Sequence, residues 1–498
     1  MKILVLGLDC AAPELLLGYE DLPNVRRLME LGGYGRLESV IPPITVPAWM
    51  CLATGQDPGS LGVYGFRNRT DHSYSGLGIA SSRSITEPAI WDYLAREGKR
   101  SIIVGVPPGY PPRRINGLSV SCFLTPDTDK NVFTHPPELS DEIRQLVGHY
   151  PVDAAGFRTN DKHPLRDAIF AMSRTQFQVV RHLIQNKEWD YFHFVDIGLD
   201  RIHHGFWKYH DPQHVLHEPN SPFKDTVHDY YRHLDDEIGQ VLELLSEDTI
   251  VLLVSDHGAQ RLDGGFCVNE WLVREGLLVL KSYPREVTPL AKLDVDWEKT
   301  RVWSEGGYYA RVFFNVKGRE PNGTIEPGEY ESFRDTIKAK FEATVDRDGQ
   351  PMGTLVFKPE QIYHKVKNVA PDLIVHFGAL YWRSIGGVGY PTLHILENDT
   401  GPDDCNHAQF GAFVLAASEL PPGPDGVVKH PPLGEVTGAR LLDIAPTLMD
   451  LAGYEVPEAM QGRSLAVAGD GEGSTSGGYD PDDESIIRDR LSGLGYIG

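Results

Sequence analysis

The chain has 498 residues, with 47 Lys and Arg against 70 Asp and Glu, which gives a formal net charge of −23. Charged residues make up 23% of the chain and hydrophobic residues 41%, proportions that exclude a disordered or fibrous protein. The acidic excess argues against nucleic-acid polymers and anionic membranes as partners, because both require a basic surface. A small phosphorylated ligand is still possible, since a metal ion or arginines can reverse the sign inside a cleft.

The cysteines and the apolar runs indicate in which cellular compartment the protein is expected. The five cysteines are an odd number, scattered and without a C-x-x-C pair, which is typical of reduced thiols. The N-terminal run MKILVLGLDC stops at Asp9 without a small-residue cleavage site, so we expect a buried strand there and not a signal peptide. No run approaches the ~18 apolar residues of a membrane span. We therefore expect a cytoplasmic protein without membrane insertion, with secretion as the less favoured alternative.

Strand-like and helix-like segments alternate along the chain. Near-continuous apolar runs predict buried parallel strands at residues 3–8, 101–106, 191–195, 249–254 and 411–416. Apolar residues at three- and four-residue intervals predict helices at 22–31, 89–97, 167–186, 223–245 and 439–452. This alternation predicts a doubly wound α/β core, a mostly parallel sheet with helices on both faces.

Three regions interrupt or follow this pattern. Residues 107–164 are rich in Pro, Gly and polar residues and are expected as a long excursion over one edge of the sheet. Residues 280–372 contain one strand-like run, a Gly/Pro-rich turn and one helical pattern, so we expect a smaller inserted lobe there. Residues 1–279 and 373–466 then form the core. Residues 467–498 are expected as an acidic Gly/Ser-rich linker and tail, since 468–484 hold six acids and no base.

Acidic residues and histidines follow two of the predicted strands. Asp9 ends the first strand, and Asp256 and His257 directly follow the strand at 249–254. Ligands of open α/β sheets bind outside the carboxyl ends of the strands, and Asp beside His offers an oxygen and a nitrogen to one divalent metal ion. The alternative, an Asp that caps a helix beside a surface His, has about equal weight for this dipeptide alone.

A second set of candidates follows the strand at 191–195. Asp200 and His204 are four residues apart, so a helical turn would place both on one face, where they can bind one ion. Asp196 and His203 are competing candidates nearby. His407 precedes the last predicted strand and is of interest only together with the other elements.

Thr45 is the candidate nucleophile. It is followed by Pro47, a residue tolerated in the first turn of a helix, and a helix N-terminus favours an incoming anion. The alternative is that Thr45 only caps this helix.

Together these residues make a two-metal set. Mixed nitrogen and oxygen ligands suit Zn²⁺, or alternatively Mn²⁺, better than Ca²⁺ or Mg²⁺, and two such ions lie ~4 Å apart in known sites. One ion takes Asp200, His204 and His407, and the other takes Asp9, Asp256, His257 and the Thr45 oxygen.

These motifs, in this order, resemble the alkaline phosphatase superfamily, in particular its type I phosphodiesterase/nucleotide pyrophosphatase branch. The segments that carry the resemblance are LGLDC, ITVPAWMCLATGQDPGSLGV, LDRIHHGFW, VSDHG and NHAQFGAFVLAA. It extends from residue 1 to about residue 466. The segments GREPNGTIEPGEY and RLSGLGYIG look like an uncharacterised bacterial subgroup of predicted phosphohydrolases or phosphomutases.

Two departures from the superfamily patterns bear on the substrate. Trp49 stands where sulfatases have an arginine, which disfavours sulfate hydrolysis. Many nucleotide pyrophosphatases have an Asn some twenty residues after the nucleophile, where this chain has Phe66, followed by Arg67, Asn68 and Arg69. We take the last three as candidate substrate-binding residues, because an arginine there can bind the extra charge of a phosphomonoester.

The resemblance implies a metal-dependent hydrolase of phosphoric esters, either diesters or monoesters. Thr45 would attack phosphorus and form a covalent phospho-threonine on the two-metal centre. The expected partner is a small phosphorylated substrate. Two alternatives are a phosphomutase or phosphotransferase that uses the same phospho-threonine, and a non-enzymatic metal-binding interaction protein on a retained fold.

Overall fold

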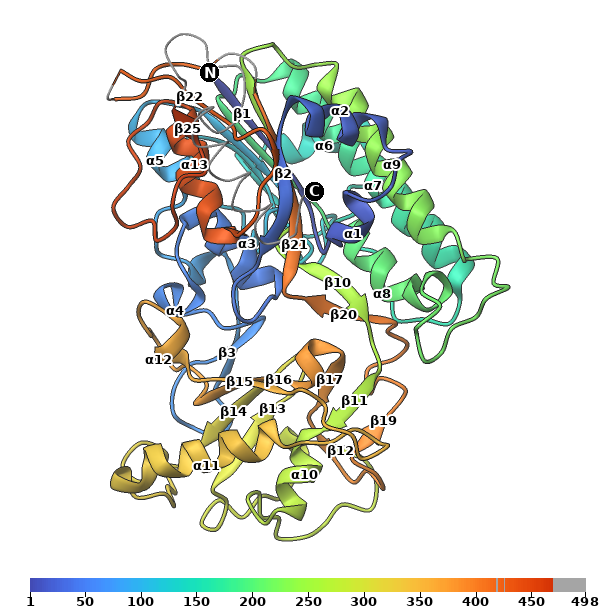
Figure 1. Ribbon diagram of the computed structural model, residues 1–498, viewed down its shortest axis with the longest axis vertical. Coiled ribbons are helices and arrows are strands. Elements are labelled where there is room, and N and C mark those ends of the chain that lie inside the picture. The colour runs from blue at the N-terminus through green and yellow to red at the C-terminus, as the bar shows by residue number, and fades with distance from the viewer. Residues whose placement is uncertain (418–419, 425, 469–498) are drawn as a thin grey trace, which may run out of the picture.

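A large sheet forms the centre of the upper part of the molecule (Figure 1). The computed structural model describes residues 1–417, 420–424 and 426–468, and the predictions made for 469–498 lie outside these residues. The strand order is β23-β2-β21-β9-β1-β8-β5-β6-β7, with β24 paired to β2. The strands are β1 (Lys2–Leu8), β2 (Gly32–Glu38), β5 (Ser101–Val104), β6 (Gly117–Val120), β7 (Thr134–His135), β8 (Tyr191–Asp196), β9 (Thr249–Val254), β21 (Phe410–Ala416), β23 (Gly434–Glu435) and β24 (Ala439–Arg440).

The middle of this sheet is parallel and fully covered. Strand β1 runs parallel to β8 on one side and β9 on the other, with Leu8 opposite Asp196 and Gly7 opposite Val254. The residues that follow these three strands therefore emerge at one edge of the sheet. Both faces of the strands are buried, which accounts for their near-continuous apolar sequences.

Helices cover both faces of the sheet, as Figure 1 shows. One hydrophobic cluster joins the sheet to helices α2 (Pro23–Leu31), α6 (Leu139–Val147), α7 (Lys162–Asn186), α8 (Gly198–His210) and α9 (Thr226–Leu242). A second cluster joins the other face to α3 (Thr45–Thr54), α5 (Ile90–Arg96) and α13 (Ile444–Leu451). The predicted doubly wound α/β fold is confirmed.

Two details of the sheet differ from the prediction. Strand β21, predicted as parallel, is antiparallel to both of its neighbours, β2 and β9. A strand that is buried on both faces reads as the same apolar run in either direction, so its sequence does not reveal its orientation. The segment 107–164 was expected to pass over the edge of the sheet, but it also contributes two strands, β6 and β7, to the sheet.

A smaller lobe lies at the opposite end of the molecule (Figure 1). Its sheet has the order β13-β14-β16-β15. The segment 280–372 supplies three of these strands and helix α11, while β16 and helix α10 lie just outside it and share the same hydrophobic cluster. The elements are α10 (Val268–Arg274), β13 (Val302–Glu305), β14 (Ala310–Phe314), α11 (Tyr330–Glu342), β15 (Leu355–Phe357) and β16 (Leu373–His376).

Short elements connect the two parts and complete the chain. The antiparallel pair β10–β20 leads from the large sheet toward the lobe, where β11 pairs with β17 and β19. No helix within the described ranges combines the length and apolarity needed to cross a bilayer. The connecting and minor elements are α1 (Pro13–Leu16), α4 (Pro58–Leu61), β3 (Arg67–Arg69), β4 (Leu77–Ile79), β10 (Gly258–Arg261), β11 (Gly264–Cys267), β12 (Thr288–Pro289), α12 (Pro359–Ile362), β17 (Trp382–Ile385), β18 (Gly387–Val388), β19 (His394–Ile395), β20 (Cys405–Ala408), β22 (Lys429–His430) and β25 (Val467–Ala468).

Packing at Gly7 yields a test of how closely α3 contacts the sheet. A Cβ atom at Gly7 would lie 2.5 Å from the Trp49 indole and 2.9 Å from Val195, so Gly7→Ala must displace a fully buried ring. We expect this variant to lose about 1–3 kcal/mol of stability, seen as a lower midpoint of thermal unfolding. Gly328→Ala is the matched control, because a Cβ there has no neighbour within 4 Å. Equal midpoints for the two variants would contradict this packing.

Candidate metal centre and active-site cleft

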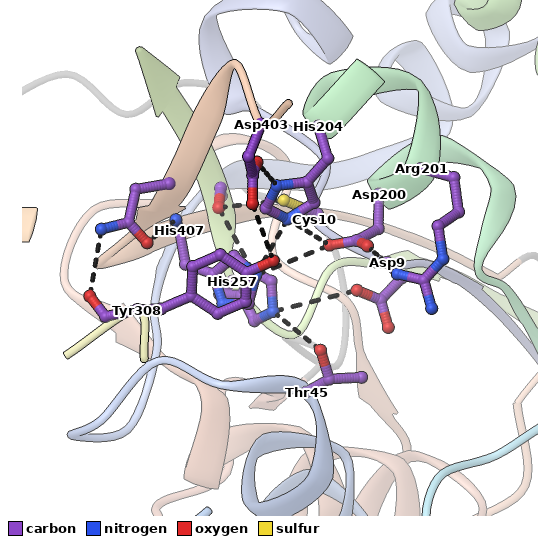
Figure 2. Close-up of polar contacts among 12 residues, drawn as sticks. Asp9, Cys10, Thr45, Asp200, Arg201, His204, His257, Tyr308, Asp403 and His407 are labelled. Atoms are coloured by element: carbon purple, nitrogen blue, oxygen red, sulfur yellow. Dashed lines mark hydrogen bonds and ion pairs between the residues drawn. The ribbon is translucent and has the colours of Figure 1, made fainter. Parts of the chain in front are cut away.

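Helix α8 and strand β20 bring together the first group of candidate ligands. Asp200 and His204 lie one turn apart on α8, with 3.3 Å between Asp200 Oδ1 and His204 Nε2. His407, on β20, places its Nε2 3.6 Å from the same carboxylate oxygen and 3.3 Å from His204 Nε2. All three side chains are buried. The structure thus unites the residues expected to bind one ion (Figure 2).

The second group lies where β1 and β9 end. His257 Nε2 is 3.3 Å from Asp256 Oδ2 and 3.8 Å from Asp9 Oδ1. Thr45, the first residue of α3, places its Oγ1 3.3 Å from the same nitrogen. Trp49, one turn further along α3, donates a 2.8 Å hydrogen bond from Nε1 to Asp9 Oδ2. This bond leaves Oδ1 of Asp9 facing His257 (Figure 2).

The competing candidates, Asp196 and His203, lie outside the two ligand groups. The Asp196 carboxylate accepts hydrogen bonds from Ser173 at 2.9 Å, from the Tyr230 hydroxyl at 3.1 Å and from the Leu199 backbone amide at 3.1 Å. It therefore anchors the start of α8. The His203 ring is buried and packs edge-on against Trp207. Neither residue belongs to a cluster of potential metal ligands among the described residues.

Cys10 is a neighbour that sequence reasoning did not consider as a ligand. It follows Asp9 directly and can form a cluster with His257 and His407. Its Sγ donates a hydrogen bond to the Gly258 carbonyl at 3.3 Å. Burial raises the pKa of the Cys10 thiol well above its usual range, and the hydrogen bond directs its S–H to a backbone oxygen and not to the histidines. We therefore assign Cys10 to packing.

Three carboxylate oxygens at the centre of the site show whether the residues fit metal ions. Asp9 Oδ1, Asp200 Oδ1 and Asp256 Oδ2 are fully buried and have no hydrogen-bond partner in the part of the chain that the structure describes. These are the atoms that face the three histidines. A buried anionic oxygen without a donor is costly, and a bound cation would remove that cost. The residues therefore fit divalent cations with mixed nitrogen and oxygen ligands.

The electrostatics of the site lead to the same conclusion. Burial and the nearby charge of Asp200 raise the pKa of Asp9, and burial and Asp9 raise that of Asp256. Burial lowers the pKa of His257 and His407, which favours the neutral imidazoles that bind metals. Asp200 is the exception: burial opposes its ionisation, but contact with His204 outweighs burial and holds its pKa well below the usual range. Without a cation, the centre must therefore keep protons that metal ions would replace.

Asp403 is a functional residue that sequence reasoning missed. Its buried carboxylate contacts His204 Nδ1 at 2.6 Å and forms ion pairs with Arg158 at 3.1 Å and Arg383 at 3.2 Å. A carboxylate on the far nitrogen of a ligating histidine fixes the orientation of the ring. The only sequence signal was its position four residues before His407. Burial works against ionisation of Asp403, but the charge of His204 outweighs it and lowers the pKa of Asp403 to about 2.

A cavity of about 300 Å³ opens over Thr45, Asp200 and His407. This volume is at the small end of the range for ligand pockets. Aromatic side chains and five arginines form its walls, although the whole chain is strongly acidic. The arginines are Arg67, Arg158, Arg201, Arg311 and Arg383.

Of the three candidate substrate-binding residues, only Arg67 lines this cavity. Asn68 accepts a 2.7 Å hydrogen bond from the Tyr64 amide and donates one of 2.9 Å to the Gly65 carbonyl, so it closes a local turn. Arg69 is buried against the lobe, where it forms a 3.3 Å ion pair with Glu320. These partners turn Asn68 and Arg69 away from the cleft. Of the other four arginines of the cleft, Arg201 lies between Asp200 and His204 in the LDRIHHGFW segment, and the remaining three come from segments that carried no readable motif.

Comparison with known proteins identifies the family. The model of the type I phosphodiesterase/nucleotide pyrophosphatase family matches residues 3–403. The chain belongs to this family. Its members hydrolyse phosphoric esters, so the chain is an enzyme of that class, and the non-enzymatic alternative is not supported. A search among curated protein sequences finds no match.

Solved structures show the same fold. Phosphonoacetate hydrolase from Sinorhizobium meliloti, solved with phosphonoformate, is 15% identical with a TM-score of 0.57, over 91% of this chain and 96% of that one. Murine ectonucleotide pyrophosphatase/phosphodiesterase 5 is 13% identical with a TM-score of 0.51, over 92% and 96% of the two chains. These likenesses confirm the alkaline phosphatase-like architecture expected from the motifs.

The raised carboxyl pKa values predict a pH-dependent effect of metal on stability. Because Asp9 and Asp256 have raised pKa values, these two carboxyls hold protons in the metal-free fold that Zn²⁺ must displace, and this competition weakens as the pH rises. His204, whose pKa is raised by Asp403 against the effect of burial, acts in the same direction. Asp200, His257 and His407 have lowered pKa values, so near neutrality they carry no proton that Zn²⁺ must displace.

We therefore expect Zn²⁺ to stabilise the protein more at about pH 7.5 than at about pH 5.5. The measurement is the difference in thermal-unfolding midpoint between Zn²⁺-loaded and EDTA-treated protein at each pH. Asp256→Asn, which removes one of the two raised carboxyls, should reduce the pH dependence. A midpoint difference that is the same at both pH values would contradict this account.

Proposed function

We propose that the enzyme hydrolyses small phosphoric esters through a covalent phospho-threonine on Thr45, with two divalent ions, Zn²⁺ or alternatively Mn²⁺. The observation that carries the proposal is the position of Thr45 Oγ1 at the start of α3, in the cavity and 3.3 Å from His257. The backbone amides of a helix N-terminus favour an anion at this place. In further support, an inactive form of murine ectonucleotide pyrophosphatase/phosphodiesterase 5 carries a threonine-to-alanine substitution and was solved with AMP.

The two ligand groups would hold one ion each. Bound there, divalent ions would lower the pKa of the Thr45 hydroxyl and compensate the negative charge of the phosphoryl group. The ions would be held by Asp200, His204 and His407 on one side, and by Asp9, Asp256, His257 and the Thr45 oxygen on the other.

The proposed reaction has two displacements at phosphorus. In the first, the deprotonated Thr45 Oγ1 forms a bond to phosphorus, the bond to the leaving oxygen breaks, and that oxygen takes a proton from solvent. In the second, a water oxygen bonds to phosphorus, the bond to Thr45 breaks, and Thr45 regains its proton. The net reaction consumes one water molecule and yields an alcohol and a phosphate or phosphomonoester.

Removal of the nucleophile is the direct test. We expect Thr45→Ala to lower kcat/KM on p-nitrophenyl phosphate and bis-p-nitrophenyl phosphate by about three orders of magnitude or more, while metal content measured by mass spectrometry stays above half that of the wild type. Thr45→Ser, which keeps a hydroxyl, should retain measurable turnover and yield a phosphorylated residue after an acid quench. Full activity of Thr45→Ala would contradict the mechanism.

The two ligand groups predict separable losses of metal. Wild-type protein should hold about two equivalents of Zn²⁺ after dialysis, whereas Asp200→Asn and Asp9→Asn should each hold about one, because each variant weakens a different group. Asp229→Asn, an exposed residue on α9 with a side chain 56% accessible to solvent, is the control and should keep both. A loss of all metal in either site variant, with its fold intact by circular dichroism, would show a single joint centre instead.

The phosphotransferase alternative shares the first displacement and differs in the acceptor of the second. Product analysis in the presence of an added alcohol separates the two reactions. Phosphate released into solution supports hydrolysis, whereas a stoichiometric new phosphoric ester of the added alcohol supports transfer.

We also propose that the enzyme works in the cytoplasm. All five cysteines are free and buried, a state that fits a reducing compartment. Oxidising conditions are not needed to hold this fold together.

A further inference from the structure

Arg311 is a buried cation in the cleft, and no carboxylate within residues 1–417, 420–424 and 426–468 pairs with it. It lies on β14 of the lobe, lines the cavity over Thr45 and is only 6% exposed. Among the described residues its guanidinium makes a single hydrogen bond, from Nη1 to the backbone carbonyl of Arg67. Glu305, directly opposite Arg311 in the β13–β14 pair, forms its ion pair with Arg67 instead, at 3.3 Å. A buried arginine is normally paired, because an isolated buried charge is costly.

The other arginines of the cleft have partners, which makes Arg311 distinct. Arg201 forms a 2.7 Å ion pair with Asp153. Arg158 and Arg383 share the carboxylate of Asp403. Arg383 is nevertheless only partly satisfied, because its buried Nε has no hydrogen-bond partner among the described residues and lies 4.0 Å from the Asp399 carboxylate. Donors on Arg311 and Arg383 therefore remain available for an anion that enters the cavity.

A second chamber shares Arg67 and Arg383 with this cavity. This chamber, of about 420 Å³, shares Arg67, Gly306, Gly307 and Arg383 with the first as common wall. Leu77, Pro289 and Tyr390 lie among its other walls. Arg67 and Arg383 thus line the boundary between the chamber that holds Thr45 and one with room for the rest of a substrate. An anionic group placed at this boundary would contact both, and could reach Arg311 on the Thr45 side.

We infer that Arg67, Arg311 and Arg383 form a subsite for a second anionic group of the substrate, a carboxylate or a phosphate, distinct from the group attacked by Thr45. The inference rests on the proposed function for the position of the reacting phosphorus. The reacting phosphoryl group is compensated at the candidate metal centre, so the uncompensated charge of Arg311 is left for another part of the molecule. The enzyme therefore selects phosphoric esters that carry a separate negative charge.

Three phosphonates that differ only in one end group test this subsite by binding. Propylphosphonate has an uncharged tail, 3-phosphonopropionate has a carboxylate, and 3-aminopropylphosphonate has an ammonium group. Isothermal titration calorimetry on Zn²⁺-loaded wild-type protein should give 3-phosphonopropionate an affinity about tenfold or more above that of propylphosphonate, as for a charge-assisted pair. The ammonium compound should bind more weakly than propylphosphonate. Propane-1,3-diphosphonate shows whether the subsite prefers a phosphate-like group to a carboxylate.

Arg311→Gln should abolish the preference for the anionic tail, and Arg311→Lys should keep part of it, because the charge remains while the planar fork is lost. Arg36→Gln, at an exposed arginine paired with Glu14, is the control and should keep the full preference. The readout is the ratio of two affinities within one variant, so a partial loss of folded protein does not alter it.

Two results would overturn the subsite. One is equal affinity of the wild type for propylphosphonate and 3-phosphonopropionate. The other is an undiminished preference in Arg311→Gln, which would show that Arg311 only supports the Arg67 backbone. Binding is measured without turnover, so failure of the phospho-threonine mechanism would appear in the Thr45 variants and leave this ratio intact.

Discussion

The structure depends on the burial of three carboxylates with unpartnered oxygens at one edge of a parallel sheet. Asp9 and Asp256 follow adjacent strands, and Asp200 is held on the helix that follows the strand on the other side of β1. The geometry of the fold thus concentrates negative charge where water has little access, a costly arrangement for a protein alone. The histidine nitrogens, the Trp49 indole and the Thr45 hydroxyl surround these carboxylates. Bound divalent cations would compensate the buried negative charge.

The core of this centre could be predicted because its signals are local. A strand that is buried on both faces has a continuous apolar sequence, and the residue that follows it lies at the carboxyl edge of the sheet. Asp9, Asp256 and His257 were found in this way. Helical spacing alone joined Asp200 to His204. Only His407 needed the other elements to be recognised, since a single histidine before a strand carries little information.

The walls of the cleft could not be predicted, because they are made by contacts between distant segments. Arg158 comes from the excursion, Arg311 and Arg383 from the lobe, and nothing in their local sequences shows that they meet over Thr45. The role of Asp403 could not be predicted for the same reason, since it depends on contacts with His204, Arg158 and Arg383. For Arg67, Asn68 and Arg69 the local sequence predicted too many substrate-binding residues. Local position suggested all three, but a turn and a buried glutamate engage two of them.

The contrast between an acidic chain and an arginine-walled cleft has a consequence for how the enzyme meets its ligands. Outside the cleft, within about a Debye length of the surface, an anionic ligand is repelled by the overall charge of −23. Within the cleft the same ligand is surrounded by guanidinium groups and attracted. Added salt should then have two opposite effects: it screens the long-range repulsion and so speeds association, and it weakens the attraction within the cleft and so lowers affinity. Encounter and retention are governed by different parts of the charge distribution, so the rate of capture can change with ionic strength independently of the affinity.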